Sequence, residues 1–214
     1  MNSLARLTRR SLLGLGIAAL VVAPALAAKP LKVTAEQARS IDAISDYING
    51  FKTMQGEFTQ ISPKGSLSRG VFYIAKPGKM RFEYAPPNPF LIVVDGKWLT
   101  IKNRAKEKGD QFPLSQTPLR LVLANKVDLV RDTHILAFEE QDGMTSVTLE
   151  DKENNLGNGQ LTLIFDQNRK ELQQWVVTDS KGRRTTVSLE NVMAGVKTDP
   201  KLFVVKIERK KRDR

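Results

Sequence analysis

Most of the chain consists of short segments in which apolar and polar residues alternate, and this pattern constrains the fold more than any other feature. Met80, Phe82 and Tyr84, for example, alternate with charged residues, which is typical of a strand with one apolar face. Turn signals such as Asp95-Gly96 separate neighbouring segments. About ten or eleven strands joined by short turns predict a meandering antiparallel sheet, curled or closed. The expected strands are 57–61, 70–75, 79–84, 90–94, 98–101, 135–140, 145–149, 161–165, 172–178, 185–189 and 202–207.

One amphipathic helix precedes these strands. Thr34 and Gln37 fit a capping box at its start, and Asn49-Gly50 marks its end. Its apolar residues recur at spacings of three and four, so they share one face. They are Ile41, Ile44, Ile48 and Phe51. A curled sheet that is not closed leaves a concave apolar face, and we expect this helix to cover part of it.

A second, shorter helix is expected among the strands, at 119–124. Pro118 suits a first helical turn, and Thr117 suits the cap before it. Leu119, Val122 and Leu123 share one face of this helix. Two interpretations stay open on the pattern alone. The helix is either a plug in the core or a lid over an apolar cavity.

Residues 1–28 are expected to be a targeting signal. Two arginines at 9 and 10 precede an apolar stretch, 12–22, and Ala25-Leu26-Ala27 offers a cleavage site. The paired arginines resemble a twin-arginine export motif, and an ordinary secretory signal explains the same residues. By either route the mature chain would leave the cytoplasm, most simply for a bacterial periplasm. Residues 29–207 would then form one domain, followed by a basic, disordered tail at 208–214.

Composition excludes several classes of function. The chain has no cysteine, which rules out disulfides, thiolate metal sites and cysteine nucleophiles. The formal charge falls from +11 to +8 if Arg6, Arg9 and Arg10 leave with the signal. A basic surface favours polyanions. For an exported protein these are anionic lipid headgroups and envelope glycolipids rather than nucleic acid.

The sequence offers no arrangement that is typical of catalysis. His134 is the single histidine, so a zinc centre would have to be built almost wholly from carboxylates, which is unusual. A serine triad would have to use His134, and no Gly-x-Ser-x-Gly elbow precedes a helix in the sequence. The glycines at 65, 70 and 78 do not precede a helix, so they form no phosphate-binding loop. We therefore expect a binding module with no catalytic residue, no metal and no cofactor. A curled sheet with covering helices suits apolar ligands, because burial of hydrocarbon contributes about 0.8 kcal/mol per methylene.

Four pieces of the sequence match a known family in their order and spacing. They are Phe51-x₆-Phe58-Thr59-Gln60, Gly70-x-Phe72-x-Ile74-x-Lys76-Pro77-Gly78-x-Met80-Arg81-Phe82-x-Tyr84-x-x-Pro87, Val94-Asp95-Gly96-Lys97-x-Leu99 and Thr117-Pro118-Leu119-x-Leu121-Val122-Leu123. On these residues the chain, from about Asp42 to Val205, resembles the periplasmic outer-membrane lipoprotein carriers, the LolA-type family. The resemblance implies a mainly β fold with helices: an unclosed antiparallel β-barrel covered by an N-terminal helix and a short lid helix around an apolar cavity.

The resemblance also implies roles for particular side chains. The residues expected to line the cavity are Phe72, Ile74, Met80, Phe82 and Tyr84. The residues expected on the inner face of the lid helix are Leu119, Val122 and Leu123.

Lys76 departs from the family pattern. Typical members have an arginine before this proline, and it points inward and holds the lid helix closed. Lysine keeps the charge but lacks the planar fork of five donors. In strand phase Lys76 lies on the side of Phe72 and Ile74, so its ammonium group needs a polar partner. We expect that partner to be a carbonyl near the end of the 119–124 helix.

The function implied by the resemblance is transport of acylated lipoproteins from the inner to the outer membrane. The implied partners are these lipoproteins, an ATP-driven inner-membrane transporter that releases them, and an outer-membrane acceptor or an anionic membrane surface. The carrier would be a monomer. The alternative is a periplasmic lipid- or glycolipid-binding protein, or an envelope-stress sensor, on the same scaffold.

Overall fold

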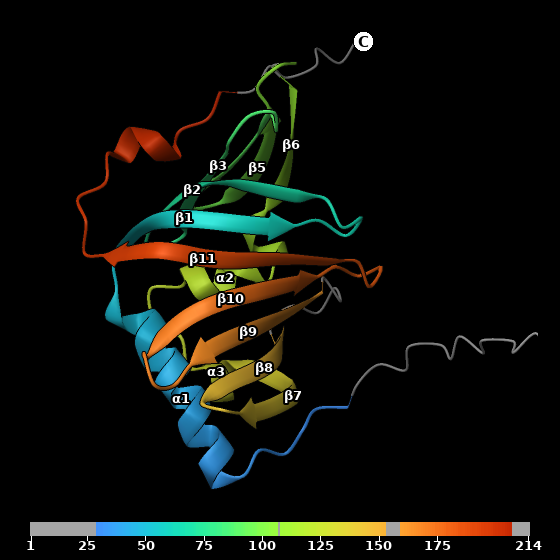
Figure 1. The fold of residues 1–214 in the computed structure, drawn as a ribbon, viewed down its shortest axis with the longest axis vertical. Coiled ribbons are helices and arrows are strands. Elements are labelled where there is room, and N and C mark those ends of the chain that lie inside the picture. Colours follow the sequence, from blue (N-terminus) through green and yellow to red (C-terminus); the bar gives the residue numbers. More distant parts are fainter. Residues whose placement is uncertain (1–28, 107, 153–158, 207–214) are drawn as a thin grey trace, which may run out of the picture.

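A computed structural model describes residues 29–106, 108–152 and 159–206 (Figure 1). The expected signal at 1–28 and the expected tail at 208–214 lie outside these residues. Eleven strands within the described ranges form a single antiparallel sheet. In chain order the elements are α1 Ala35–Gly50, β1 Thr53–Ile61, β2 Leu67–Ala75, β3 Lys79–Tyr84, β4 Phe90–Asp95, β5 Trp98–Asn103, β6 Lys108–Pro113, η1 Leu114–Gln116, α2 Leu119–Leu123, α3 Leu129–Asp132, β7 Thr133–Gln141, β8 Met144–Asp151, β9 Gln160–Asp166, β10 Glu171–Thr178, β11 Arg184–Ala194 and η2 Pro200–Phe203.

The order of the strands explains how the sheet stays open. It runs β6-β5-β4-β3-β2-β1-β11-β10-β9-β8-β7, so the first and last strands pair at the centre and the two middle strands form the edges. The chain must cross from one edge to the other between β6 and β7. That crossing contains η1, α2 and α3, which lie behind the strands in Figure 1. The predicted unclosed, curled antiparallel sheet is confirmed.

Helix α1 forms as its sequence predicts. The Thr34 hydroxyl accepts from the Gln37 amide, and the Gln37 side chain accepts from the Thr34 amide, which satisfies two of the free amides at the start of the helix. Ile41, Ile44 and Ile48 are fully buried against the sheet. The helix ends at Gly50, so Phe51, predicted on the same face, is buried one residue beyond it.

Ten of the predicted strands are present and one is wrong. Residues 202–207 were expected to be a strand, but the chain forms the 3₁₀ helix η2 there, because Asp199 caps the Lys201 amide and Pro200 starts the turn. Phe203 is buried, and Arg81 Nη1 donates to the Leu202 carbonyl at 2.8 Å. The C-terminal segment thus packs on β3 and β4, and position 207 lies outside the described residues.

Strand β6 was missed because Lys108–Pro113 has no alternating apolar pattern. It joins the sheet through backbone pairing with β5, from Trp98↔Pro113 to Asn103↔Lys108. A polar, partly charged sequence of this kind is tolerated at an edge, where one side of the strand faces solvent.

Close packing between strands explains Gly70 in β2. A Cβ atom at this position would lie 2.0 Å from the Glu83 carbonyl oxygen and 2.8 Å from the Phe58 ring. Only a residue without a side chain allows β2 to approach β3 this closely at the curve of the sheet.

Candidate functional site

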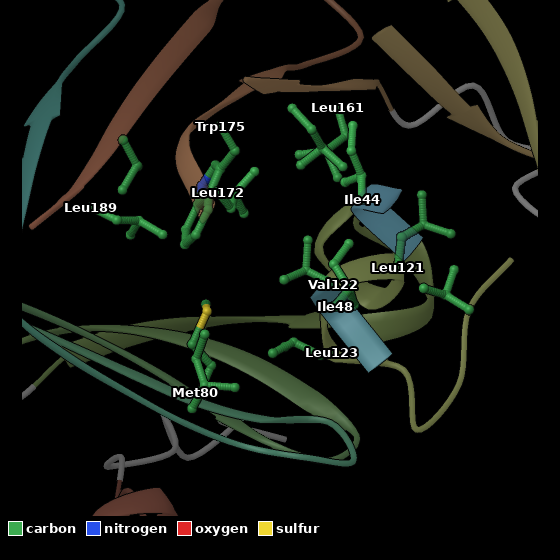
Figure 2. Packing of buried hydrophobic residues seen from close by; sticks show 14 of the residues in the cluster. Ile44, Ile48, Met80, Leu121, Val122, Leu123, Leu161, Leu172, Trp175 and Leu189 are labelled. Carbon is green, nitrogen blue, oxygen red and sulfur yellow. The ribbon is translucent and has the colours of Figure 1, made fainter. Parts of the chain in front are cut away.

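The five predicted cavity residues point into one apolar interior. Phe72, Ile74, Met80, Phe82 and Tyr84 are each at most 5% exposed and belong to a single buried cluster. Figure 2 shows Met80 on one side of this interior, residues of β9–β11 opposite it, and side chains of α1 and α2 beside them. In the structure these side chains pack against one another. Their role in binding a ligand remains a prediction.

Aromatic rings dominate the half of the interior that β1–β3 contribute. The Phe82 ring lies 4.5 Å from the Phe58 ring and 5.7 Å from the Phe72 ring, centroid to centroid. It also meets Trp175 of β10 edge-on at 5.9 Å. The buried Tyr84 hydroxyl donates to Gln60 Oε1 at 2.6 Å. Burial raises the pKa of Tyr84 to about 12, so this buried phenol stays neutral well above pH 7.

Helix α2 lies where the lid helix was predicted. Val122 and Leu123 are buried, and Leu119 is half-buried against the same cluster. Leu121, which the helical spacing placed on another face, is buried too. The predicted cap is wrong: the Thr117 hydroxyl donates to the Leu114 carbonyl of η1 at 3.0 Å, and α2 begins without a side-chain cap.

Two contacts attach α2 to the sheet. At one end, the Arg120 guanidinium pairs with the Asp151 carboxylate of β8 through two N–H groups. The Asp151 side chain is 1% exposed and that of Arg120 is 26% exposed, so the pair is largely removed from water. At the other end, the Gly78 amide donates to the Leu123 carbonyl at 2.8 Å. The second contact joins α2 to the turn between β2 and β3.

The expected partner of Lys76 is wrong. Its Nζ donates to the Ile48 carbonyl at the end of α1, at 2.5 Å, and lies 4.5 Å from the centre of the Phe51 ring. The C-terminal end of a helix presents free carbonyls that attract cations, and the turn brings Lys76 to α1 rather than to α2. Burial lowers the pKa of Lys76 to about 8.

A cleft of about 610 Å³ leads from the surface to this interior. Its floor is apolar and its rim carries charges of both signs. The floor residues are Phe51, Met54, Leu172 and Leu189, and the charged rim residues are Arg169, Glu171 and Glu190. The floor residues are members of the buried cluster.

The cleft exists because β10 and β11 separate at one end. Their pairing starts only at Gln174↔Ser188, although β10 begins at Glu171 and β11 continues to Ala194. An irregularity between Leu172 and Gln174 shifts the register with β9, and another between Gln55 and Glu57 shifts the register of β1 with β11. Bulges of this kind bend strands locally. The sequence signal for the first irregularity is a break in alternation, because the buried residues Leu172 and Trp175 are three positions apart. The sequence analysis did not use this signal, so the cleft was not predicted.

His134 lies in β7, opposite Glu150 of β8. Among the residues that the structure describes, no three or more His, Cys, Asp or Glu side chains are grouped so that they could hold a metal ion. None of the helices in the described ranges is both long and apolar enough to cross a bilayer.

The sequence is similar to proteins of one family. Residues 49–206 match the family profile described as outer membrane lipoprotein carrier protein LolA. An outer-membrane lipoprotein carrier protein of Neisseria meningitidis strain FAM18 is 28% identical over 180 residues, which cover 80% of this chain and 83% of that one. The protein of the same name from Dechloromonas aromatica is 27% identical over 165 residues, covering 72% and 77%.

Among solved structures, a LolA superfamily protein from Nitrosomonas europaea aligns with a TM-score of 0.44 at 13% identity, covering 81% of this chain and 99% of that one. The family profile spans well over half of the sequence. The chain therefore belongs to the LolA family of outer-membrane lipoprotein carrier proteins.

Proposed function

We propose that this protein binds the acyl chains of lipoproteins in its apolar interior and carries them through the periplasm from the inner to the outer membrane. The observation that supports this most is an apolar interior that is covered by a short, lightly attached helix and reached by a cleft. Membership of the carrier family supports the same role. Residues 1–28 would be the export signal, and residues 29–207 the single carrier domain.

Binding would exchange internal contacts for contacts with the ligand. Each methylene of an acyl chain that leaves water contributes about 0.8 kcal/mol. This gain is opposed by the loss of the contacts that α2 and the inner side chains make with one another, because they must move apart to admit the acyl chain. Because α2 has only five residues and two polar attachments, it is the covering element that can move with the least loss of packing.

The turn between β2 and β3 is the proposed latch of the closed form. Lys76 holds α1 through the Ile48 carbonyl, and Gly78 holds α2 through the Leu123 carbonyl. A ligand that displaces α2 must break the second contact. We further propose that a monomer receives its cargo from an ATP-driven inner-membrane transporter and gives it up at the outer membrane. No bond-making step is assigned to the protein.

Competition at the apolar interior tests the proposal. The protein is titrated with an apolar fluorescent probe, and a lipoprotein with palmitoyl chains is then added. We expect the acylated lipoprotein to displace the probe and the same lipoprotein without its acyl chains to leave it bound. If the lipoprotein displaced the probe to the same extent with and without its acyl chains, recognition of the acyl chains would be contradicted.

A matched pair of variants locates the site. Met80→Glu places a carboxylate in the interior and should abolish loading, whereas Val71→Glu, on the exposed face of the neighbouring strand β2, should leave loading unchanged. Thermal unfolding checks that both variants fold. Material that co-purifies with the unaltered protein gives an independent test by mass spectrometry: an acylated protein supports the proposal, and a glycolipid or phospholipid in its place favours a carrier of other lipids.

A further inference from the structure

Three turns of the sheet meet at one end of the molecule. The turn β1–β2, the loop β3–β4 and the turn β5–β6 all connect strands at this end, because consecutive strands of β1–β6 are neighbours. Figure 1 shows the β1–β2 turn at the right-hand ends of these two strands. We name residues 61–69, 85–90, 102–106 and 108 the turn surface.

Hydrogen bonds hold the turn surface together. The Ala85 amide donates to the Arg69 carbonyl at 2.8 Å, and the Arg104 amide donates to the Pro89 carbonyl at 2.9 Å. Asn88 Nδ2 donates to the Ser68 hydroxyl at 2.9 Å, and Arg104 Nη2 donates to the Tyr84 carbonyl at 2.7 Å. The side chains of the surface are therefore presented by a connected frame rather than by independent loops.

Large apolar side chains are exposed on this frame. Ile61, Leu67 and Phe90 are 45%, 57% and 40% exposed. Leu67 and Phe90 also line a groove of about 510 Å³ together with Ser68, Arg69 and residues 85–89. Exposed apolar residues gathered in one place indicate a contact surface.

The same surface is strongly basic. Its sequence contains six lysines and arginines, and the three connections 61–69, 85–90 and 102–108 contain one acid, Glu107. The basic residues are Lys64, Arg69, Lys102, Arg104, Lys106 and Lys108. Exposed apolar side chains surrounded by cations complement the surface of an anionic bilayer, in which the apolar groups enter the acyl boundary and the cations meet lipid phosphates.

We propose that the turn surface docks the protein on bilayers that contain anionic phospholipid. Ile61, Leu67 and Phe90 reach into the headgroup region, and the surrounding cations contact phosphates. This site lies at the end of β1 opposite the cleft, whose floor includes Met54 at the start of that strand. Docking therefore leaves the cleft uncovered and does not depend on the proposed acyl binding.

Vesicle flotation of the exported protein tests the proposal. The protein should float with vesicles of phosphatidylglycerol and phosphatidylcholine, stay behind with phosphatidylcholine alone, and dissociate at high salt, since salt screens exposed charges. Leu67→Ser/Phe90→Ser should weaken flotation by about tenfold or more, because two large apolar side chains leave the acyl boundary. The control Trp98→Ser/Phe112→Ser removes side chains of similar exposure, 37% and 46%, from the other end of β5 and β6, and should bind like the unaltered protein.

Two triple variants test whether the place of the positive charges matters or only their number. Lys64→Gln/Arg69→Gln/Lys106→Gln should weaken binding by about fivefold for each cation removed, whereas Lys52→Gln/Lys181→Gln/Lys197→Gln removes the same charge elsewhere and should change it little. The assignment of the surface would be overturned if the two triple variants lost the same amount of vesicle binding. It would also be overturned if Leu67→Ser/Phe90→Ser and Trp98→Ser/Phe112→Ser lost the same amount. Failure of the unaltered protein to float with anionic vesicles would overturn the bilayer as its partner. Neither result affects the probe competition that tests the carrier function.

Discussion

Helices α1 and α2 cover the same apolar sheet, but they are attached to it in different ways. α1 has sixteen residues, a complete capping box and three fully buried isoleucines. Asn49 near its end exchanges two hydrogen bonds with the Val127 backbone, at 2.7 and 2.9 Å. α2 has five residues and no side-chain cap, and a helix this short has no stability of its own. The comparison teaches that both helices bury apolar side chains, but only α1 adds a cap and a length that favour the helix by themselves. The helix α2 depends on the packing of Leu121, Val122 and Leu123 and on the contacts at its two ends.

The largest expected effect is on the core helix. Ile48→Ala leaves a cavity beneath α1 and should lower the free energy of unfolding by about 4 kcal/mol. Leu119→Ala in α2, where the side chain is half-buried, should cost about 1 kcal/mol, because less buried surface is lost. Urea unfolding of both variants measures the difference. Similar losses in the two would show that α2 is as much a part of the core as α1.

The next effect concerns the ion pair that holds α2. Asp151→Asn removes the buried carboxylate that faces Arg120 and should lower the free energy of unfolding by about 2 kcal/mol, less than for a fully buried pair because Arg120 is partly exposed. It should also strengthen binding of an apolar probe, since α2 then leaves the sheet more easily. Guanidinium unfolding and a fluorescence titration measure the two changes.

The control for this ion pair is Arg131→Gln. Arg131 pairs with Asp132, and the Arg131 side chain is 77% exposed. Ion pairs as exposed as this one contribute little to the free energy of unfolding. If the two variants changed probe binding equally, the Arg120–Asp151 contact would not be what holds α2 on the sheet.

The fold could be predicted from the sequence wherever burial follows a regular period. The alternation in β3 and β9 and the spacing of isoleucines in α1 correspond directly to which side chains are buried. The pattern failed for β6, which has no apolar face, and for 202–207, where Asp199-Pro200 starts a turn before an apolar run. In 202–207 the turn that Asp199 and Pro200 start decided the structure, although the residues after it are mostly apolar.

The site could be predicted only in part. Strand phase placed Phe72 and Met80 in the interior, because alternation decides which way a strand residue points. It could not supply the partner of Lys76, since that depends on which helix packs beside the β2–β3 turn. Nor did it supply the cleft. The irregularity after Leu172 breaks the alternation of β10, but this break does not reveal that β11 separates from β10 there.

A smaller effect is expected where the two helices begin. Thr34→Ala removes the cap of α1 and should lower the free energy of unfolding by about 1 kcal/mol. Thr117→Ala, before α2, removes no cap and should cost less than about 0.5 kcal/mol. Neither variant should change the affinity for an apolar probe, since neither touches the contacts that attach α2. Thermal unfolding and probe titration check these expectations. If Thr34→Ala bound the probe more tightly, α1 would also control access to the interior, which would contradict the difference drawn between the two helices.

A further effect is a pH dependence that arises where the β2–β3 turn meets α1. Burial lowers the pKa of Lys76 to about 8 in the folded protein, from an ordinary value of 10.5. Between these values the unfolded chain binds more protons than the folded one, so the free energy of unfolding rises with pH. Burial raises the pKa of Tyr84 from 10.0 to about 12, which lowers stability as the pH increases above about 10. The contribution of Lys76 is therefore measured between pH 8 and pH 10.

Lys76→Met should flatten the rise in stability across that window, because the methionine has no proton to release. Lys79→Met, three residues along the same turn, is the matched control and should keep the rise. Urea unfolding midpoints at several pH values measure both. If the rise survives in Lys76→Met, the ammonium group is not held in the apolar interior. The turn would then be attached beside α1 by its backbone alone, through the Lys76 amide and the Lys52 carbonyl at 2.8 Å, and the side-chain contact with Ile48 would contribute nothing to the stability of the helix that belongs to the core.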